Sequence, residues 1–315
     1  MKSFLSIFFL CVSYTYCIGQ TKNSNNMTYS KNNEPRDYSK MIYSLSVNSM
    51  DCEFVVKVDD VLAFKQEQGS GGSTTFKLNQ FILNNGEHTV EVEMYPLHGK
   101  HVLGDAQVIL TFHRYPKNDM ANSYDSFKTV KSYILNEAGE VVNDISNMKR
   151  YSFSATFQAT GLPIGNMGWK NSVTLQKEDQ AKLHKELYNE YRKIHAILKN
   201  KDLDAFLELT RPREELIDFT NCFRDIDRKA RLNGINNMIN AKGAILSELP
   251  EIHETHMLFE ANGKLVTLLD NNNRAIIQFV SEQNNSMRNQ ILFKFYRKDN
   301  NSMLEVINEY EHSKL

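Results

Sequence analysis

The stretch GLPIGNMGWKNSVT, residues 161–174, separates two parts of the chain that have different hydrophobic periodicity. Before it, apolar and polar residues alternate in short runs. After it, apolar residues recur every three or four positions. Alternation is the period of a β-strand, and a three-to-four spacing is that of a helix. The sequence therefore predicts two domains, one over residues 41–165 and one over residues 175–310.

The first of these parts has the pattern of an all-β domain. The run TVEVEM places Val90, Val92 and Met94 on one face of a strand and Glu91 and Glu93 on the other. The run SFSATFQA alternates in the same way, and turn formers such as GSGGS and NEAGE separate the runs. This arrangement resembles the immunoglobulin-like fold, which implies an antiparallel sandwich whose two sheets share one core.

The second part begins with helices and ends with strands. A first apolar stripe is formed by Leu183, Leu187, Tyr191, Ile194 and Leu198. Two further stripes predict helices over residues 216–230 and 235–246, with a stop at Pro250. Strand-like runs follow, from THMLFEA to MLEVI, and turn sequences such as NG and NNN separate them. Helices followed by an antiparallel meander belong to the α+β class.

A family resemblance follows from this order of elements. The segment LYNEYRKIHAILKNKDLDAFLEL, residues 187–209, has a long helix that runs into a short second helix at NKDLDAF. With the later helices and the meander, it is similar to the ketosteroid-isomerase-like (SnoaL-like) cone fold over residues 175–310. The resemblance implies that the first helix lines a pocket. Four helices precede the sheet and no polar constellation matches the family, so no catalytic residue is carried over.

The N-terminus has the layout of an export signal. Lys2 precedes the apolar run FLSIFFLCVSY, and small residues near Gly19 mark a cleavage site, so residues 1–19 are predicted to be a signal peptide. The protein is then periplasmic or extracellular. A lipid anchor at Cys17, which would make an outer-membrane lipoprotein, is disfavoured by the bulky Tyr16. Residues 20–40 are polar and are predicted to form a flexible leader.

Composition excludes several classes of protein. The formal net charge of −1 gives no electrostatic footprint for nucleic acid. No apolar run of about 18 residues follows the signal, so no membrane span is expected. Cys52 and Cys222 are the cysteines left after cleavage, and the sequence leaves open whether they are bridged or separately buried.

The sequence HETH, residues 253–256, is the first candidate for a metal site. Its histidines are three apart, whereas a zinc-protease helix requires a spacing of four. In a strand, His253 and His256 would project to opposite faces, one toward the helices and one outward. His98 and His101 lie in an expected loop without further ligands at a matching spacing. No metal site and no cofactor are predicted.

Three residues of the first long helix are candidates for a binding site. Tyr188, Tyr191 and His195 lie near one face of the helix and, in a cone-type fold, would line the pocket. The alternative, which the sequence favours, is an amphipathic helix whose aromatic side chains pack in the core. No serine or cysteine nucleophile motif and no phosphate-binding loop occurs, so no catalytic residue is predicted.

These observations predict an exported, non-enzymatic binding protein of the cell envelope. Its ligand would be a protein, a small molecule or a glycan, and an immunity-type protein that occludes its partner is one instance. The alternative is a small-molecule hydrolase or isomerase with a pocket in the C-terminal domain. An enzymatic activity is the less favoured of the two.

Overall fold

The computed structural model describes residues 37–66, 71–117, 124–131, 133–135, 141–163, 165, 167–241, 243–281 and 288–313. The predicted signal peptide, including Cys17, and most of the predicted leader lie outside these residues. The chain is mostly β, with 43% of it in strands, four described α-helices and several antiparallel sheets. No described helix has the length and apolar character needed to cross a membrane.

The N-terminal part consists of strands in two four-stranded antiparallel sheets. The first sheet has the order β4 (Gly71–Lys77), β1 (Asp37–Met50), β6 (Gln107–Lys117) and β7 (Tyr124–Lys131). The second has the order β10 (Tyr151–Ala159), β5 (Gly86–Pro96), β2 (Cys52–Val58) and β3 (Val61–Gln66). A separate two-stranded sheet pairs β8 (Tyr133–Leu135) with β9 (Val141–Asp144).

Alternation along these strands places their apolar residues in one core. Val90 and Val92 of β5 are fully buried, and they cluster with Leu45 of β1 and Phe54 of β2, so both sheets contribute. Glu91, which lies between the two valines, is exposed. The alternation predicted for TVEVEM is therefore confirmed.

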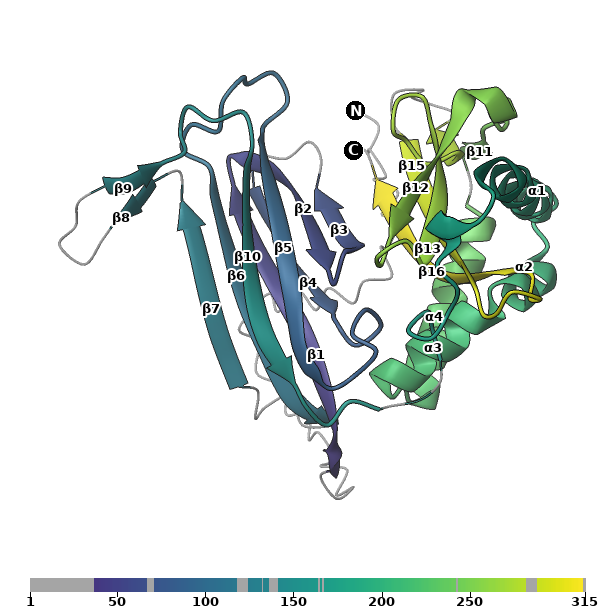
Figure 1. The fold of residues 1–315 in the computed structure, drawn as a ribbon, viewed down its shortest axis with the longest axis horizontal. Helices are drawn as coiled ribbons and strands as arrows, with labels where there is room; N and C mark the ends of the chain where they lie inside the picture. Colours follow the sequence, from purple (N-terminus) through teal and green to yellow (C-terminus); the bar gives the residue numbers. More distant parts are fainter. Residues whose placement is uncertain are drawn as a thin grey trace, which may run out of the picture.

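The C-terminal part contains four helices and a six-stranded sheet. The helices are α1 (Gln180–Lys199), α2 (Leu203–Leu209), α3 (Arg211–Asn221) and α4 (Asp225–Ile239). The sheet has the order β11 (Ala244–Leu246), β14 (Ile277–Ser281), β15 (Arg288–Arg297), β13 (Leu265–Asp270) and β12 (Thr255–Glu260), and β16 (Leu304–Ser313) also pairs with β15. Figure 1 shows this sheet between the N-terminal sheets and helices α1 and α2.

Helix α1 has the amphipathic character that its sequence predicts. The Asp179 carboxylate caps it by accepting hydrogen bonds from the backbone N–H groups of Ala181 and Lys182, each at 3.0 Å. All five residues of the predicted stripe are buried: Leu183, Leu187, Tyr191, Ile194 and Leu198.

Two of the predicted helices have different limits in the structure. The stripe expected over 216–230 is broken at Cys222, which adopts a left-handed conformation (φ 50°, ψ 49°) and ends α3. Phe219 and Ile226 are consequently 39% and 66% exposed. The helix expected over 235–246 ends at Ile239, because residues 244–246 pair as a strand with β14. Strand pairing has overridden the local helical spacing.

Cys52 and Cys222 are not bridged to each other. Cys52 is buried in the N-terminal core, whereas Cys222 is partly exposed at the end of α3. Burial raises the pKa of the Cys52 thiol to about 11, so this thiol stays protonated at neutral pH.

A buried ion pair of the C-terminal sheet lies at the contact with the N-terminal part. Lys294 of β15 and Glu260 at the end of β12 are 2.7 Å apart, with side chains only 1% and 6% exposed. The Lys294 ammonium also donates a 2.6 Å hydrogen bond to the Leu62 carbonyl oxygen of β3. Burial lowers the pKa of Lys294, and the carboxylate of Glu260 opposes that effect. The ammonium is therefore shared between the C-terminal sheet and an edge strand of the N-terminal part.

Further hydrogen bonds join the C-terminal part to the N-terminal part at this junction. The backbone N–H of Ala261 donates to the Asp60 carbonyl oxygen, and the N–H of Asn262 donates to the Asp60 carboxylate at 3.1 Å. Both donors belong to the β12–β13 turn, in which Gly263 has a φ of +80° and leaves no room for a Cβ beside Gln176. The edge strand β3 is thus covered by the C-terminal part, which keeps it from pairing with other chains.

Removing the Lys294 ammonium group should destabilise the folded protein. Lys294→Met leaves a buried carboxylate without its partner, and we expect the free energy of unfolding to fall by about 3–5 kcal/mol. The double variant Lys294→Met/Glu260→Leu should be more stable than Lys294→Met alone, because no uncompensated charge is left. Urea denaturation measures all three proteins. Lys199→Met removes the exposed pair with Glu248 and should cost less than about 1 kcal/mol; equal losses for Lys294→Met and Lys199→Met would contradict the prediction.

A second charged cluster holds α4 against α3. The Glu214 carboxylate accepts hydrogen bonds from Arg213, which is fully buried, and from Arg231 of α4. Burial alone would raise the pKa of Glu214, but the two guanidinium groups outweigh it and lower the pKa from 4.5 to about 2. The folded state therefore favours the ionised form.

This pKa shift predicts a pH-dependent stability. A depressed folded pKa contributes stability that is fully present above pH 4.5 and is lost as the pH falls through about 2. Glu214→Gln should lower the free energy of unfolding at pH 7 by about 2–3 kcal/mol and should flatten its decline between these pH values. Denaturation curves at a series of pH values test this. A variant with the same acid dependence as the wild type would show that Glu214 is not the responsible group.

Candidate functional site

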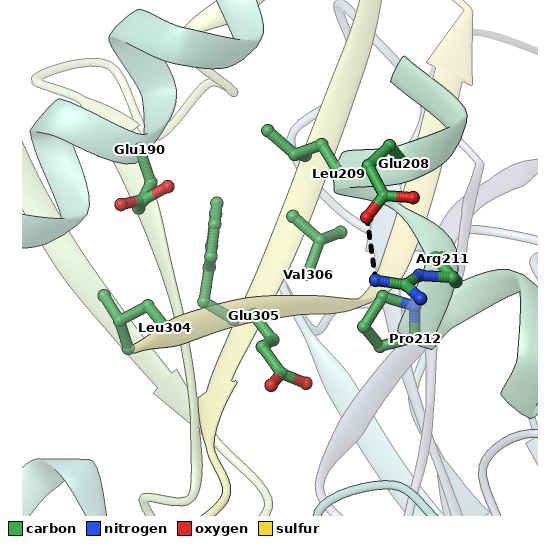
Figure 2. A pocket seen from close by; sticks show the side chains of 9 residues that line it. Glu190, Glu208, Leu209, Arg211, Pro212, Leu304, Glu305 and Val306 are labelled. Carbon is green, nitrogen blue, oxygen red and sulfur yellow. Dashed lines mark hydrogen bonds and ion pairs between the residues drawn. The ribbon is translucent and has the colours of Figure 1, made fainter. Parts of the chain in front are cut away.

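A surface hollow of the C-terminal part lies between α1, the α2–α3 corner and β16. We call it the α2–β16 hollow. It has a volume of about 230 Å³. Figure 2 shows its side chains, which are Glu190, Glu208, Leu209, Arg211, Pro212, Phe295, Leu304, Glu305 and Val306.

Local sequence explains the corner that forms one wall of this hollow. The Asp202 carboxylate caps the start of α2 by accepting a hydrogen bond from the N–H of Ala205. The helix ends at Thr210, whose hydroxyl donates to the Phe206 carbonyl oxygen. Pro212 then lies in the first turn of α3, where its missing N–H costs nothing. The chain changes direction between α2 and α3, which places Glu208 and Arg211 at the rim.

The floor of the α2–β16 hollow is apolar and rigid. Phe295 and Val306 are paired across β15 and β16, and each is only 1% exposed. Leu304 lies beside them on β16 and is also buried. The aromatic ring of Tyr191 packs on Phe295 from the core side, with ring centroids 5.4 Å apart. The floor is therefore part of the hydrophobic core and holds its shape without a ligand.

Three carboxylates belong to the residues that line this hollow. Glu190 of α1 is 15% exposed and contacts Lys193 at 2.7 Å, while Glu208 pairs with Arg211 at 2.7 Å. The Glu305 carboxylate accepts a 3.0 Å hydrogen bond from the Tyr296 hydroxyl. In Figure 2, Glu190 and Glu208 lie on the same side of β16 as the floor, whereas Glu305 projects from its other face. Such a surface suits a group with an apolar body and a cationic end.

The second hollow, of about 220 Å³, lies beside the outer face of α1. It is lined by Tyr188, Arg192, His195, Glu248 and Leu249. The Tyr188 hydroxyl donates to the Pro250 carbonyl oxygen at 2.8 Å, and Nε2 of His195 donates to the Ser247 carbonyl oxygen at 2.9 Å. These bonds attach residues 247–250 to α1. The structure thus brings Tyr188 and His195 together in one hollow. The Tyr188 hydroxyl and Nε2 of His195 are each hydrogen-bonded to a backbone carbonyl oxygen.

Tyr191, the third candidate of the sequence, lies in the core and lines neither hollow. Its hydroxyl is 2.8 Å from Thr267 Oγ1, donates to the Phe293 carbonyl oxygen at 2.9 Å and accepts from the Leu268 N–H at 3.3 Å. Burial raises the pKa of Tyr191 to about 12. The hydroxyl therefore remains protonated and ties α1 to the sheet.

The HETH histidines do not lie on opposite faces of one strand. His253 is part of a 3-10 turn, and His256 is in β12, where its Nε2 lies 3.1 Å from Asn273 Oδ1. Both side chains are exposed, as are His98 and His101. The expected inward histidine is absent because the strand begins only at Thr255. In the described ranges no three His, Cys, Asp or Glu side chains are placed to hold a metal ion.

Sequence reasoning missed the carboxylates of the α2–β16 hollow. Glu190 and Glu208 lie on the consecutive helices α1 and α2, whereas Glu305 lies on β16 much later in the chain, so no local motif marks the three together. It also missed His88, which is 2% exposed and is bonded through both ring nitrogens, to Asp59 and to the Asn84 carbonyl oxygen. Tyr188 and His195 are two helical turns apart on α1, and this spacing is the feature of the second hollow that the sequence shows.

Comparison with known proteins found no match: neither a family model, nor a curated protein, nor a solved structure corresponds to this chain.

Tyr191 should prove to be a structural residue. Tyr191→Phe removes a fully buried hydroxyl and leaves the Leu268 N–H without its acceptor, so we expect the free energy of unfolding to fall by about 1–3 kcal/mol. Tyr188→Phe removes a half-buried hydroxyl with one partner and should cost less than about 1 kcal/mol. Thermal and chemical denaturation compare the two variants. Equal stability of Tyr191→Phe and wild type would refute this role.

Proposed function

We propose that the chain is an exported, non-enzymatic binding protein of the cell envelope and that the α2–β16 hollow is its recognition site. The observation that carries the proposal is an apolar floor with the carboxylates of Glu190 and Glu208 at its rim. The ligand is then a group with an apolar stem and a cationic head, such as a lysine side chain of a partner protein or a small organic ammonium ion. Within this proposal, the N-terminal sheets form an immunoglobulin-like sandwich domain and residues 175–310 form a second, cone-type α+β domain.

The charges at the rim support a cation more than an anion. Glu190 and Glu208 already hold Lys193 and Arg211, which are 57% and 61% exposed, so the carboxylates can exchange these partners for a ligand at little cost. The apolar floor would desolvate the stem of the ligand and contribute about 25 cal/mol per Å² of buried surface. Because the floor residues are at most 6% exposed, both affinity and selectivity for a cation would come mainly from the rim.

The alternative function, a small-molecule hydrolase or isomerase, depends on Tyr188, Tyr191 and His195. Acid–base chemistry needs a side chain that can reach the substrate with a free proton site. The Tyr191 hydroxyl has three partners in the core, and the Tyr188 and His195 side chains are bonded to residues 247–250. These bonds favour the binding function over the enzymatic one.

Titration with n-hexylammonium tests the recognition site. The mature protein should bind n-hexylammonium, and it should bind hexanol at least about tenfold more weakly because hexanol lacks the charge. Glu190→Gln should weaken n-hexylammonium binding about tenfold, whereas the matched variant Glu248→Gln at the second hollow should leave it unchanged. NMR chemical-shift titration provides the affinities. Equal binding of the amine and the alcohol, or an unaffected Glu190→Gln variant, would reject the site.

A lysine-containing peptide in the same titration distinguishes the two sources of the cation. Binding of the peptide with higher affinity than n-hexylammonium indicates a protein partner, and the reverse order indicates a small amine. Mass spectrometry of the mature N-terminus addresses export. Gln20 as the first residue supports the soluble exported form, and a lipid-modified Cys17 supports the outer-membrane lipoprotein.

A further inference from the structure

A two-residue turn of unusual backbone conformation joins β2 to β3. Val58 pairs with Val61, so Asp59 and Asp60 form the turn, and both have positive φ angles, of 48° and 65°. Tight hairpin turns with two left-handed residues usually have glycine at the second position. Because aspartate adopts this region less readily than glycine, contacts from outside the turn are needed to hold Asp60 in this conformation.

Asp60 contacts the C-terminal part in this conformation. Its carbonyl oxygen accepts a hydrogen bond from the N–H of Ala261 at 3.3 Å, and its carboxylate accepts one from the N–H of Asn262 at 3.1 Å. Ala261 and Asn262 are themselves left-handed, with φ angles of 52° and 55°. Two left-handed turns therefore meet at the junction, and a change in the conformation of either one separates the donors from the acceptors.

A buried histidine holds the Asp59–Asp60 turn from the N-terminal side. Nδ1 of His88 lies 2.5 Å from Oδ2 of Asp59, and Oδ1 of Asp59 accepts a 3.0 Å hydrogen bond from the N–H of Thr89. The N–H of Asp59 also donates to the Thr89 carbonyl oxygen at 3.0 Å. These three bonds fix the position of Asp59, and Asp60 follows it directly in the chain.

The hydrogen bonds of His88 require a proton on both ring nitrogens. Nε2 lies 2.7 Å from the Asn84 carbonyl oxygen, which can only accept, and Nδ1 faces the Asp59 carboxylate. A neutral imidazole donates from one nitrogen, whereas the imidazolium form donates from both. The geometry therefore matches the imidazolium form of His88.

The groups packed around His88 favour this form. The turn contributes the Asp59 carboxylate, the loop before β5 contributes the Asn84 carbonyl group, and β10 contributes the ring of Phe157, whose centroid is 5.7 Å from that of His88. Burial alone would lower the pKa of His88, which is 2% exposed, but the hydrogen bonds to Asp59 and Asn84 outweigh it. The pKa of His88 is thus raised above its ordinary value of 6.5.

We propose that protonated His88 makes the junction between the two parts of the chain pH-sensitive, because loss of its proton to solvent releases the Asp59–Asp60 turn. The folded state binds this proton more tightly than the unfolded state. The stabilisation is therefore fully present below pH 6.5 and is lost as the pH rises through the raised pKa of His88. The contacts of Asp60 with the C-terminal part then weaken, whereas Lys294 still binds the Leu62 carbonyl oxygen.

An NMR titration of the mature chain from neutral to alkaline pH tests this proposal. At neutral pH, both ring nitrogens of His88 should have the nitrogen chemical shifts of an imidazolium ion. Above the midpoint of His88, the protection of the Ala261 and Asn262 amides from hydrogen exchange should fall at least about tenfold, after correction for the intrinsic pH dependence of exchange. The Gly104 amide bonds to the Ser146 carbonyl oxygen away from this junction and should keep its protection.

The variant Asp59→Asn removes the charge but preserves the shape of the turn. Asparagine tolerates the left-handed conformation and can accept the hydrogen bond from Thr89. Without the carboxylate, the midpoint of His88 should fall by at least about one pH unit. The loss of protection at the junction should move to lower pH by the same amount.

The matched control is Asp51→Asn, because Asp51 is also a left-handed aspartate between two strands, with a φ of 55°. It should leave both midpoints unchanged. An unprotonated ring nitrogen of His88 at neutral pH overturns the proposal. A His88 titration that leaves Ala261 and Asn262 protected, or that is unaffected by Asp59→Asn, overturns it as well. If Asp59→Asn does not fold, the wild-type titration decides the outcome.

Discussion

The ion pair between Lys294 and Glu260 is the constraint on which the rest of the structure depends. Both groups lie out of water, where a charge is stable only beside a compensating charge and with its hydrogen bonds satisfied. The ammonium satisfies this requirement with one carboxylate of its own sheet and one carbonyl oxygen of β3. This contact acts together with the hydrogen bonds from Ala261 and Asn262 to Asp60 to position β3 relative to the C-terminal sheet.

This pair also connects the junction to the α2–β16 hollow. Lys294 and Phe295 are consecutive residues of β15, so the lysine points toward the N-terminal sheets and the phenylalanine toward the helices. The β15–β16 ladder shifts register between these two residues, and the skipped residue, Ile307, packs in the N-terminal core cluster. Because of the bulge at this point, β15 presents the buried charge of Lys294 on one face and the apolar floor of the hollow on the other.

The sequence predicted those features that depend on local periodicity. The apolar stripe of α1 and the alternation of TVEVEM are both found in the structure, because each pattern faces a single core. The prediction failed where a non-local contact decided the outcome. Residues 244–246 are a strand because β14 is available to pair with them, and α3 ends at Cys222, after which Arg231 of α4 can reach Glu214. Neither partner can be identified from the neighbouring sequence.

The candidate site was predictable only in part, for the same reason. Tyr188 and His195 share a hollow because they are two turns apart on one helix, which a sequence shows. The carboxylates of Glu190 and Glu208 lie at the rim of the apolar floor only after the sheet has folded against α1 and α2. A hollow that is assembled from distant elements has no sequence motif, and its chemistry can be recognised only from the fold.

Native-state hydrogen exchange tests most directly whether the buried pair makes β3 and β15 one cooperative unit. If it does, the amides of residues 61–66 and 288–297 should exchange through the same opening reaction, with one free energy and one dependence on denaturant. An opening of β3 at a clearly lower free energy, with β15 still protected, would show that the two parts separate easily and that the Lys294–Glu260 pair does not hold them together.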